Sequence, residues 1–356
     1  MRGLATPKLP WMRVWEQSMM DNWRSPKRCL CVLLPFLIAI SYIYLPSCAY
    51  YINDDLSTRQ LTNLKIHRDG VIILGMHRSG TSVLAGLLSK MGLNTGGPLL
   101  PPSKDNPRGF FEREDIVIQN HILLRHQFIR YAYHTQYYDA NTGLQLAMSN
   151  SSLFAYGRQA LAFLNDPLNH PYLLKDPRFC ITLRTWLPLI QVTPAILFIY
   201  RHPFDVALSL HRRGHELFRI SKGLRLWYVY NRRAIQQSHD LCKVVTSYES
   251  LMADPKGELD RVYRELRDSC GFDIPRMISN EDITFLVNVT LQSRKPRVIN
   301  EPCQVDGRSI EPPRTWMSPS EGDLLLYRKV VMAFCAMESR TAFLSTFDWD
   351  DTIRDV

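Results

Sequence analysis

The sequence contains no Cys-x-x-Cys pair and no cluster of cysteine and histidine with the spacing of a zinc site, so no metal is predicted. Only eight cysteines occur in the 356 residues, and five of them follow the long apolar run near the N-terminus. That set is odd in number and too sparse for a disulfide scaffold. It leaves room for one or two bridges if this part of the chain faces an oxidising lumen, but their pairing cannot be read from the sequence.

Internal repeats and low-complexity tracts are also absent, and we expect one domain from about residue 68 to the end. Hydrophobic residues make up 46% and charged residues 22% of the chain, which is ordinary for a globular protein. The net charge is +9, and residues 1–52 hold six basic against two acidic side chains. The mildly basic remainder suits an anionic cofactor or acceptor, although surplus lysine and arginine is usually solvated surface, and no nucleic-acid partner is expected.

Charged residues are missing from Cys29 to Ile52, and this run is long enough to cross a bilayer, which takes about 20 apolar residues. Basic residues precede it and aspartates follow it: Arg24, Lys27 and Arg28, then Asp54 and Asp55. The positive-inside rule then puts the N-terminus in the cytosol and the body in the lumen. We therefore predict a cytosolic tail at 1–28, a transmembrane signal anchor at 29–52, a stem at 53–69 and the functional domain at 70–356.

A cleaved signal peptide is the main alternative to this anchor, because Ser47 and Ala49 could form a small-residue cleavage site. The 28 residues before the apolar run favour an uncleaved anchor. Two Asn-x-Ser/Thr sequons, at Asn150 and Asn288, fall in the predicted lumenal part. Such triplets often arise by chance, so they permit a lumenal body without showing it.

The body alternates apolar runs with helical patterns, which predicts an α/β fold with a mainly parallel sheet flanked by helices. Strands are expected at Val71–Leu74, Tyr172–Leu174, Ala195–Tyr200 and Lys243–Thr246. Helices are expected at Thr81–Met91, Ile116–Arg130, Phe204–His211, Leu224–His239, Lys256–Leu266 and Asp323–Met337. Proline, glycine and asparagine are frequent in Pro98–Gly109, which predicts a loop.

The sharpest motif is the octet Gly75–Ser82, Gly-Met-His-Arg-Ser-Gly-Thr-Ser, between a predicted strand and a predicted helix. Glycines allow a tight turn whose backbone N–H groups converge on an anion at the helix N-terminus. Thr81 and Ser82 can add hydroxyl donors, and Arg78 can neutralise a leaving phosphate. An ordinary glycine-bearing turn is the competing interpretation of this octet taken alone.

A nucleotide-hydrolase P-loop would read Gly-x-x-x-x-Gly-Lys-Ser/Thr. Gly75 and Gly80 have that spacing, but Thr81 stands in the lysine position, and the basic residue is Arg78. This departure weighs against an ATPase or GTPase.

A second motif lies about 120 residues further on, where Arg201 follows the strand Ala195–Tyr200 and Ser209 comes eight residues later on a predicted helix. A turn and two helical turns can bring both side chains to one anion. Pro203 and Asp205 lie between them.

Together the two motifs resemble the sulfotransferase family over most of residues 70–270, and most closely the branch whose loop reads Gly-Met-His-Arg-Ser-Gly-Thr-Ser. Further segments fit that branch: Asn106–Glu112, Leu174–Arg178 and Ser247–Leu251. The resemblance implies a P-loop-like parallel sheet and the donor 3′-phosphoadenylyl sulfate (PAPS). It further implies that the 5′-phosphosulfate is held by Arg78, Ser79, Gly80, Thr81 and Ser82, the 3′-phosphate by Arg201 and Ser209, and the adenosine by Tyr248.

One family element has no clear counterpart, the Arg-Lys-Gly sequence with which cytosolic sulfotransferases close over the cofactor. The segment Gln292–Arg297 is basic but lacks the glycine, so it can equally be solvated surface. The final eighty residues carry little functional information.

Catalytic roles are predicted for Arg78, Lys175 and Glu112. Lys175 follows a strand, where ligands approach an open α/β sheet, and could touch the sulfuryl oxygens; a surface network of Lys175, Asp176 and Arg178 is the alternative. The resemblance implies a catalytic role for Glu112 by its region only, because several Golgi sulfotransferases place a catalytic glutamate there; a structural role is the alternative. The other candidate bases are His77, Asp115 and His121.

The predicted function is in-line transfer of a sulfuryl group from PAPS to an acceptor hydroxyl, with a carbohydrate favoured as acceptor. The predicted location is a type II membrane protein of the Golgi or another secretory membrane. A small-molecule kinase and a catalytically inactive lumenal binding protein of the same fold are the alternatives.

Overall fold

A computed structural model of the protein describes residues 68–103, 106–130, 134–214, 219–293, 303, 311–313, 316 and 318–355. The predicted cytosolic tail, the predicted anchor at Cys29–Ile52, most of the predicted stem and most of Gln292–Arg297 lie outside these residues. Within the part that is described, no helix is long and apolar enough to span a membrane.

Four parallel strands form the central sheet: β1 (Gly70–Leu74), β2 (Tyr172–Lys175), β3 (Ala195–Tyr200) and β4 (Lys243–Ser247). Their order is β2-β1-β3-β4, and Ile72 of β1 pairs with Leu174 on one side and Ile196 on the other. The chain leaves β1 toward one edge and β3 toward the other. The carboxyl ends of β1 and β3 therefore flank a topological switch point, where open α/β sheets bind ligands.

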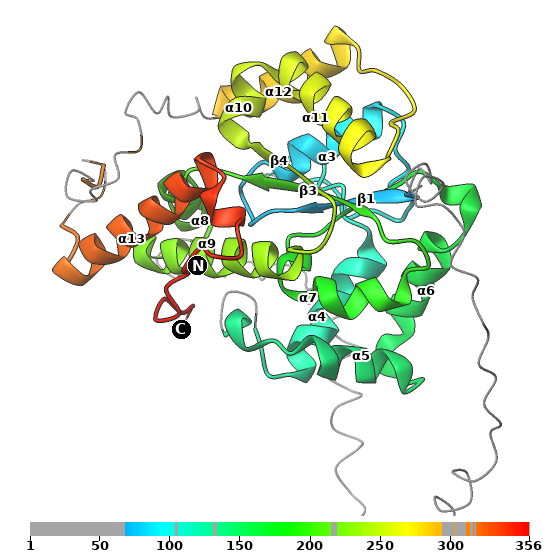
Figure 1. Cartoon of the computed structure of the whole chain (residues 1–356), viewed down its shortest axis with the longest axis horizontal. Helices are drawn as coiled ribbons and strands as arrows, with labels where there is room; N and C mark the ends of the chain where they lie inside the picture. The colour runs from blue at the N-terminus through cyan, green and yellow to red at the C-terminus, as the bar shows by residue number, and fades with distance from the viewer. Residues whose placement is uncertain are drawn as a thin grey trace, which may run out of the picture. The chain divides into compact units, whose positions relative to one another are not determined.

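Side chains alternate across β1, so that each face of the sheet has its own core. Val71 and Ile73 pack with α3 (Thr81–Lys90), α11 (Pro255–Cys270) and α12 (Asn280–Ser293). Ile72 and Leu74 face the other layer, and Figure 1 shows the two sets of helices on opposite sides of the sheet. That second layer contains α4 (Glu114–His126), α5 (Ala140–Met148), α6 (Ala155–Leu164), α7 (Phe179–Trp186), α8 (Pro203–Gly214), α9 (Ile220–Gln237) and α13 (Glu321–Glu338). The predicted α/β fold with a parallel sheet is confirmed.

Each of the six predicted helices is present, with ends shifted by a few residues. The helix predicted at Ile116–Arg130 starts two residues earlier and stops at His126, because Phe128 has a left-handed φ of 60°. The sequence patterns missed α5, α6, α7, α12 and the short α10 (Tyr248–Ala253). In α7 seven of the eight residues are buried, so no polar stripe marks it as a helix.

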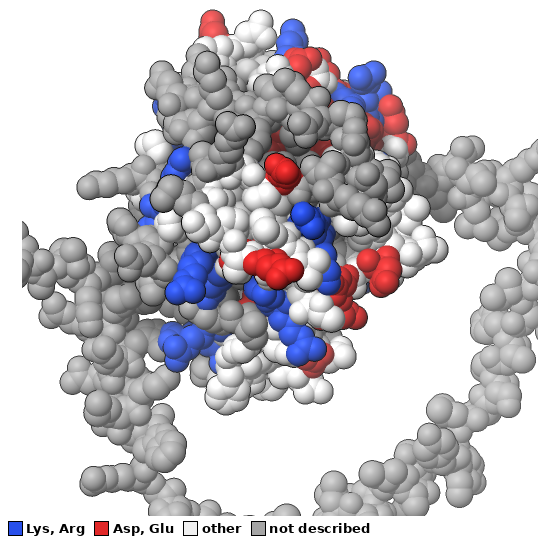
Figure 2. Space-filling model, turned by 90° about the vertical axis from the view of Figure 1, so that its left-hand side faces the viewer, with Lys and Arg blue, Asp and Glu red and all other residues white. Residues whose placement is uncertain are grey.

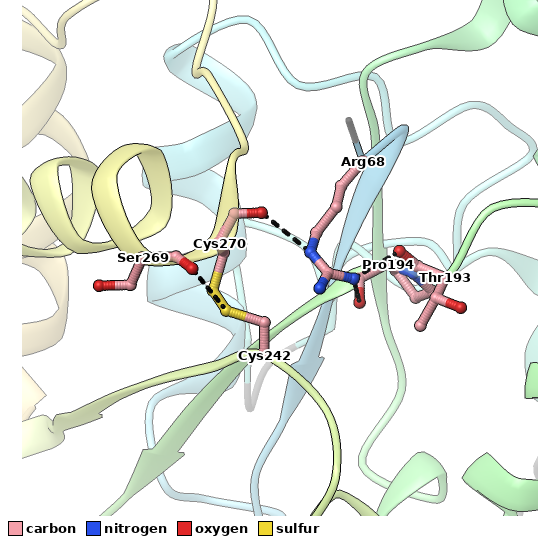
Figure 3. Close-up of a disulfide and its surroundings, with 6 residues drawn as sticks. All are labelled: Arg68, Thr193, Pro194, Cys242, Ser269 and Cys270. Carbon is pink, nitrogen blue, oxygen red and sulfur yellow. Dashed lines mark hydrogen bonds between the residues drawn. A yellow bond between two sulfur atoms is a disulfide. The ribbon is translucent and has the colours of Figure 1, made fainter. Parts of the chain in front are cut away.

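Two disulfides join Cys242 to Cys270 and Cys303 to Cys335, while Cys180 is free and buried. The first ties the start of β4 to the end of α11. Next to it the Arg68 guanidinium donates to the carbonyl oxygens of Cys270 and Thr193, each at 2.9 Å (Figure 3). The residues that precede β1, β3 and β4 are thus fastened together at the amino ends of the strands.

The described surface carries charges of both signs. On the face shown in Figure 2, several separate groups of lysine and arginine side chains alternate with carboxylates. Among the described residues, Lys329 forms an ion pair with Asp350 at 2.6 Å.

Candidate active site

The loop after β1 needs both of its glycines. A Cβ on Gly75 would overlap the carbonyl oxygen of Ile199 in β3. Gly80 has a φ of 87°, and a Cβ there would lie 2.5 Å from the ring of Tyr248. Arg78 also has a positive φ, 72°. This tight turn ends where α3 begins, so its backbone N–H groups lie at the N-terminus of a ten-residue helix.

The two predicted phosphate-binding motifs meet at the carboxyl ends of β1 and β3. Arg78 donates from Nε to Ser209 Oγ at 2.9 Å, and Arg201 donates from Nη1 to the carbonyl oxygen of Arg78 at 3.3 Å. The Arg201 guanidinium also lies 4.1 Å from the centre of the Tyr248 ring. The structure therefore brings together residues from the loop, from α8 and from the end of β4.

Two polar donor atoms of this cluster are buried. Ser79 and Arg201 are 0% and 6% exposed, and among the described residues neither Ser79 Oγ nor Arg201 Nε has a hydrogen-bond partner. A buried donor without an acceptor costs about 1–3 kcal/mol, so such atoms are rare unless they bind something. Both atoms are donors beside a helix N-terminus. That donor set fits a phosphate ester.

Lys175 links the loop to Glu112. At the end of β2 its Nζ donates to Glu112 Oε1 at 2.5 Å and to Ser82 Oγ at 3.1 Å. Arg178 Nη1 lies 4.0 Å from the other oxygen of Glu112. These side chains are nearly buried, so the ion pair is shielded from water and stronger than a surface pair. The predicted catalytic residues Arg78, Lys175 and Glu112 are thus connected through one loop.

Asp176 holds Arg178 in place through a buried network that the sequence did not reveal. Asp176 Oδ1 accepts from Arg178 Nη1 at 2.7 Å, and Oδ2 accepts from Asn120 Nδ2 at 2.8 Å. Asn120 Oδ1 in turn accepts from Thr182 Oγ1 and Trp186 Nε1, both at 2.8 Å. Asp176 therefore orients Arg178, and because Lys175, Asp176 and Arg178 are all buried, the alternative of a surface network is wrong. Asn120 could have been noticed only as a polar residue in the apolar stripe of α4.

The remaining candidate bases differ from Glu112. Asp115 forms an ion pair with buried Arg113 at 2.6 Å, so its carboxylate is bound to Arg113 rather than to Lys175. Burial lowers the pKa of His121 to about 4, with a further contribution from Arg178. Burial lowers the pKa of His77 well below its ordinary value, again reinforced by Arg178. Both imidazoles are consequently neutral at pH 7.

A parallel α/β sheet with a glycine-bearing loop at its switch point defines the class of open α/β proteins that bind ligands at this edge of the sheet, and sequence comparison identifies the family. Residues 70–268, more than half of the chain, match the sulfotransferase family. The chain belongs to the sulfotransferase family, which confirms the resemblance seen in its two motifs. No curated protein was found to match the sequence.

Solved structures give a distant likeness. The sulfotransferase domain of the olefin synthase from Synechococcus PCC 7002 is 18% identical, with a TM-score of 0.37, covering 74% of this chain and 95% of that one. A sulfotransferase domain from the curacin biosynthetic pathway is 15% identical, with a TM-score of 0.37 and coverages of 80% and 94%. The sulfotransferase STF1 of Mycobacterium tuberculosis H37Rv is 17% identical, with a TM-score of 0.32 and coverages of 65% and 74%.

Proposed function

We propose that this sulfotransferase takes its sulfuryl group from PAPS and transfers it to an acceptor hydroxyl. The observation that supports PAPS as the donor is the cluster of Arg78, Arg201 and Ser209, where the two motifs meet and Arg201 Nε is buried without a hydrogen-bond partner among the described residues. A nucleotide with one phosphate on each side of its ribose would need two such groups of donors. The membership in the family supports the reaction type.

When bound, PAPS supplies the sulfuryl group and leaves as 3′,5′-adenosine bisphosphate (PAP). Arg78 and the amides of the loop neutralise the leaving phosphate. Arg201 and Ser209 would hold the 3′-phosphate, and the Tyr248 ring would contact the adenosine. Preorganised donors of this kind lower a barrier by several kcal/mol because they need no rearrangement as charge develops.

Glu112 and Lys175 act on the transferred group and its acceptor. The acceptor oxygen forms a bond to sulfur while the bond from sulfur to the phosphate oxygen breaks, and the acceptor proton passes to Glu112. Lys175, whose Nζ lies 2.5 Å from Glu112 Oε1 and 3.1 Å from Ser82 Oγ, would neutralise charge on the sulfuryl oxygens. Charge neutralisation and proton removal are the two needs of such an in-line transfer.

The decisive experiment is Glu112→Gln, with turnover measured on labelled PAPS and a panel of glycans and peptides. The variant keeps an oxygen that can accept from Lys175 but cannot take a proton. We expect PAP affinity to be unchanged and turnover to fall roughly 10²–10⁴-fold. Near-normal turnover, with chemistry shown to be rate-limiting, would exclude Glu112 as the base and make His121 the next to test.

Donor competition separates this function from the kinase alternative. A sulfotransferase with these residues should bind PAP far better than AMP, because only PAP carries the 3′-phosphate. Equal affinity for PAP and AMP, together with turnover of ATP, would favour the kinase. PAP binding without turnover on any acceptor would favour an inactive binding protein.

We propose further that the body lies in the lumen of a Golgi-type membrane and that its acceptor is a carbohydrate. Two disulfides among the described residues support an oxidising compartment. Asn150 of the first sequon is exposed, in the turn between α5 and the next helix. Expression of the full chain in cells with a secretory pathway tests this: a deglycosidase shift that Asn150→Gln reduces is expected, and digestion of the body by protease in intact microsomes would exclude a lumenal body.

A further inference from the structure

The peptide group between Arg201 and His202 is bound at both of its polar atoms. Its carbonyl oxygen, that of Arg201, accepts from the indole Nε1 of Trp227 at 2.8 Å. Its N–H, that of His202, donates to Glu249 Oε1 at 3.0 Å. A peptide group is planar, so two hydrogen bonds on opposite edges fix its orientation. That orientation determines the direction in which the Arg201 side chain leaves the strand end.

Trp227 fastens this peptide to α9. The indole is 0% exposed, and one helical turn later Tyr230 packs edge-on against His77 of the phosphate-binding loop, with ring centres 5.7 Å apart. The same helix face therefore contacts both phosphate-binding elements. Residues three apart lie on one side of a helix, so α9 sets the distance between Arg201 and the loop.

Glu249 approaches the peptide from the other side, directly after Tyr248. Oε1 accepts the His202 N–H, whereas Oε2 is buried and has no hydrogen-bond partner among the described residues. The charged and titratable groups that act on it are Arg201, His202, Tyr200 and Glu338, and Arg340 acts on Tyr200. The carboxyl thus has one satisfied oxygen, one cation beside it and a second carboxylate nearby.

We propose that Trp227 and Glu249 are positioning residues, which hold the Arg201–His202 peptide so that Arg201 meets the 3′-phosphate of the donor, and that Glu249 couples this binding to a proton. The proposal rests on PAPS as the donor. Neither residue touches the nucleotide in this scheme; both act through the backbone of Arg201.

Coupling to a proton follows from the surroundings of Glu249. Burial raises its pKa to about 7, with Glu338 adding to the rise and the His202 N–H and Arg201 opposing it. A phosphate bound to Arg201 adds negative charge near the Glu249 carboxyl. It also pairs with the Arg201 guanidinium, which then stabilises the Glu249 carboxylate less, so the pKa of Glu249 rises further. Binding of PAP above pH 7 should therefore take up a fraction of a proton, and affinity should fall as pH rises from about 7 to 8.

Calorimetric titration of PAP and AMP, in buffers of different ionisation enthalpy, tests both parts. Glu249→Gln keeps an acceptor for the His202 N–H and should lose the proton uptake that wild type shows beyond the titration of the phosphate itself. Trp227→Phe keeps a buried ring but loses the indole donor. Its preference for PAP over AMP should fall roughly threefold to tenfold, the range for one neutral hydrogen bond, while AMP affinity stays within about twofold.

Two matched controls separate positioning from general damage. Glu258→Gln removes another paired carboxylate, on α11, which contacts Thr246 and Arg261. Trp349→Phe replaces another buried indole, which packs against Tyr228 and Phe347 outside the network around Arg178. Both controls should keep the PAP preference and the proton uptake. The proposal is overturned if wild type prefers PAP while Trp227→Phe keeps the full preference or Glu249→Gln keeps the uptake; failure of wild type to prefer PAP would instead overturn the proposed donor.

Discussion

The loop after β1 and the turn after β3 both provide arginines to one cluster, yet they are stabilised in different ways. The loop is built by its own residues: two glycines, a positive φ at Arg78 and the first turn of α3. The turn is held by Trp227 and Glu249, which lie 26 and 47 residues away from their partners. A local motif can thus define one half of a site, whereas tertiary contacts define the other.

The largest effect on stability and on PAP affinity is expected from a substitution in the loop after β1. Gly80→Ala would force a Cβ to within 2.5 Å of Tyr248 at a φ of 87°. Backbone strain and overpacking each cost about 1–3 kcal/mol, so we expect a clear loss of stability and a fall in PAP affinity of roughly 100-fold. Denaturant unfolding and calorimetry measure the two.

Gly109→Ala is the matched control for this change. Gly109 has a φ of 92°, but nothing lies within 4 Å of the position of its Cβ. The control carries the backbone cost alone, about 1–2 kcal/mol, and should leave PAP affinity nearly intact. Equal losses of PAP affinity in both variants would mean that the contact with Tyr248 does not matter.

The difference between the two regions also explains what sequence reasoning could find. The four strands were predicted to within a residue, because buried parallel strands are short and mostly apolar runs. The loop was recognised from eight consecutive residues. Arg201 and Ser209 were found because their spacing is also local, and the structure places both next to Arg78.

Contacts between distant segments were beyond the sequence patterns. Glu112 was a candidate by region only, and its contact with Lys175 depends on how the loop before α4 crosses the strand ends. Asn120 and Trp227 look like ordinary helix residues until their hydrogen-bond partners are known. The disulfide pairing could not be predicted for the same reason, since nothing along the chain indicates that β4 starts beside the end of α11.

An intermediate effect, on stability alone, is expected when a contact between distant segments is removed far from the site. Replacing Cys242 and Cys270 by serine opens a loop with a sequence separation of 28 at the amino end of β4. Loop entropy predicts a loss of about 3–4 kcal/mol in the free energy of unfolding. PAP affinity should stay within about twofold, because Tyr248 and Glu249 follow the opposite end of the strand.

The pair Cys303 and Cys335 provides the matched control, with a sequence separation of 32. Loop entropy predicts nearly the same loss for its serine variant. A much smaller loss for the variant of Cys242 and Cys270 would show that Arg68 and the packing of α11 hold this end of the sheet without the bridge.

The smallest effect is expected where the two regions touch, at the hydrogen bond from Arg78 to Ser209. Ser209→Ala removes the acceptor 2.9 Å from Arg78 Nε and one proposed donor to the 3′-phosphate. The loss should be about 1 kcal/mol, or roughly fivefold in PAP affinity, with AMP affinity nearly unchanged. Ser238→Ala is the control, because Ser238 is also buried and donates to Ala234 O at 2.7 Å at the far end of α9. If Ser209→Ala weakens AMP and PAP equally, Ser209 serves to orient Arg78 in the loop rather than to bind the 3′-phosphate, and the two regions would share one function instead of dividing the phosphates between them.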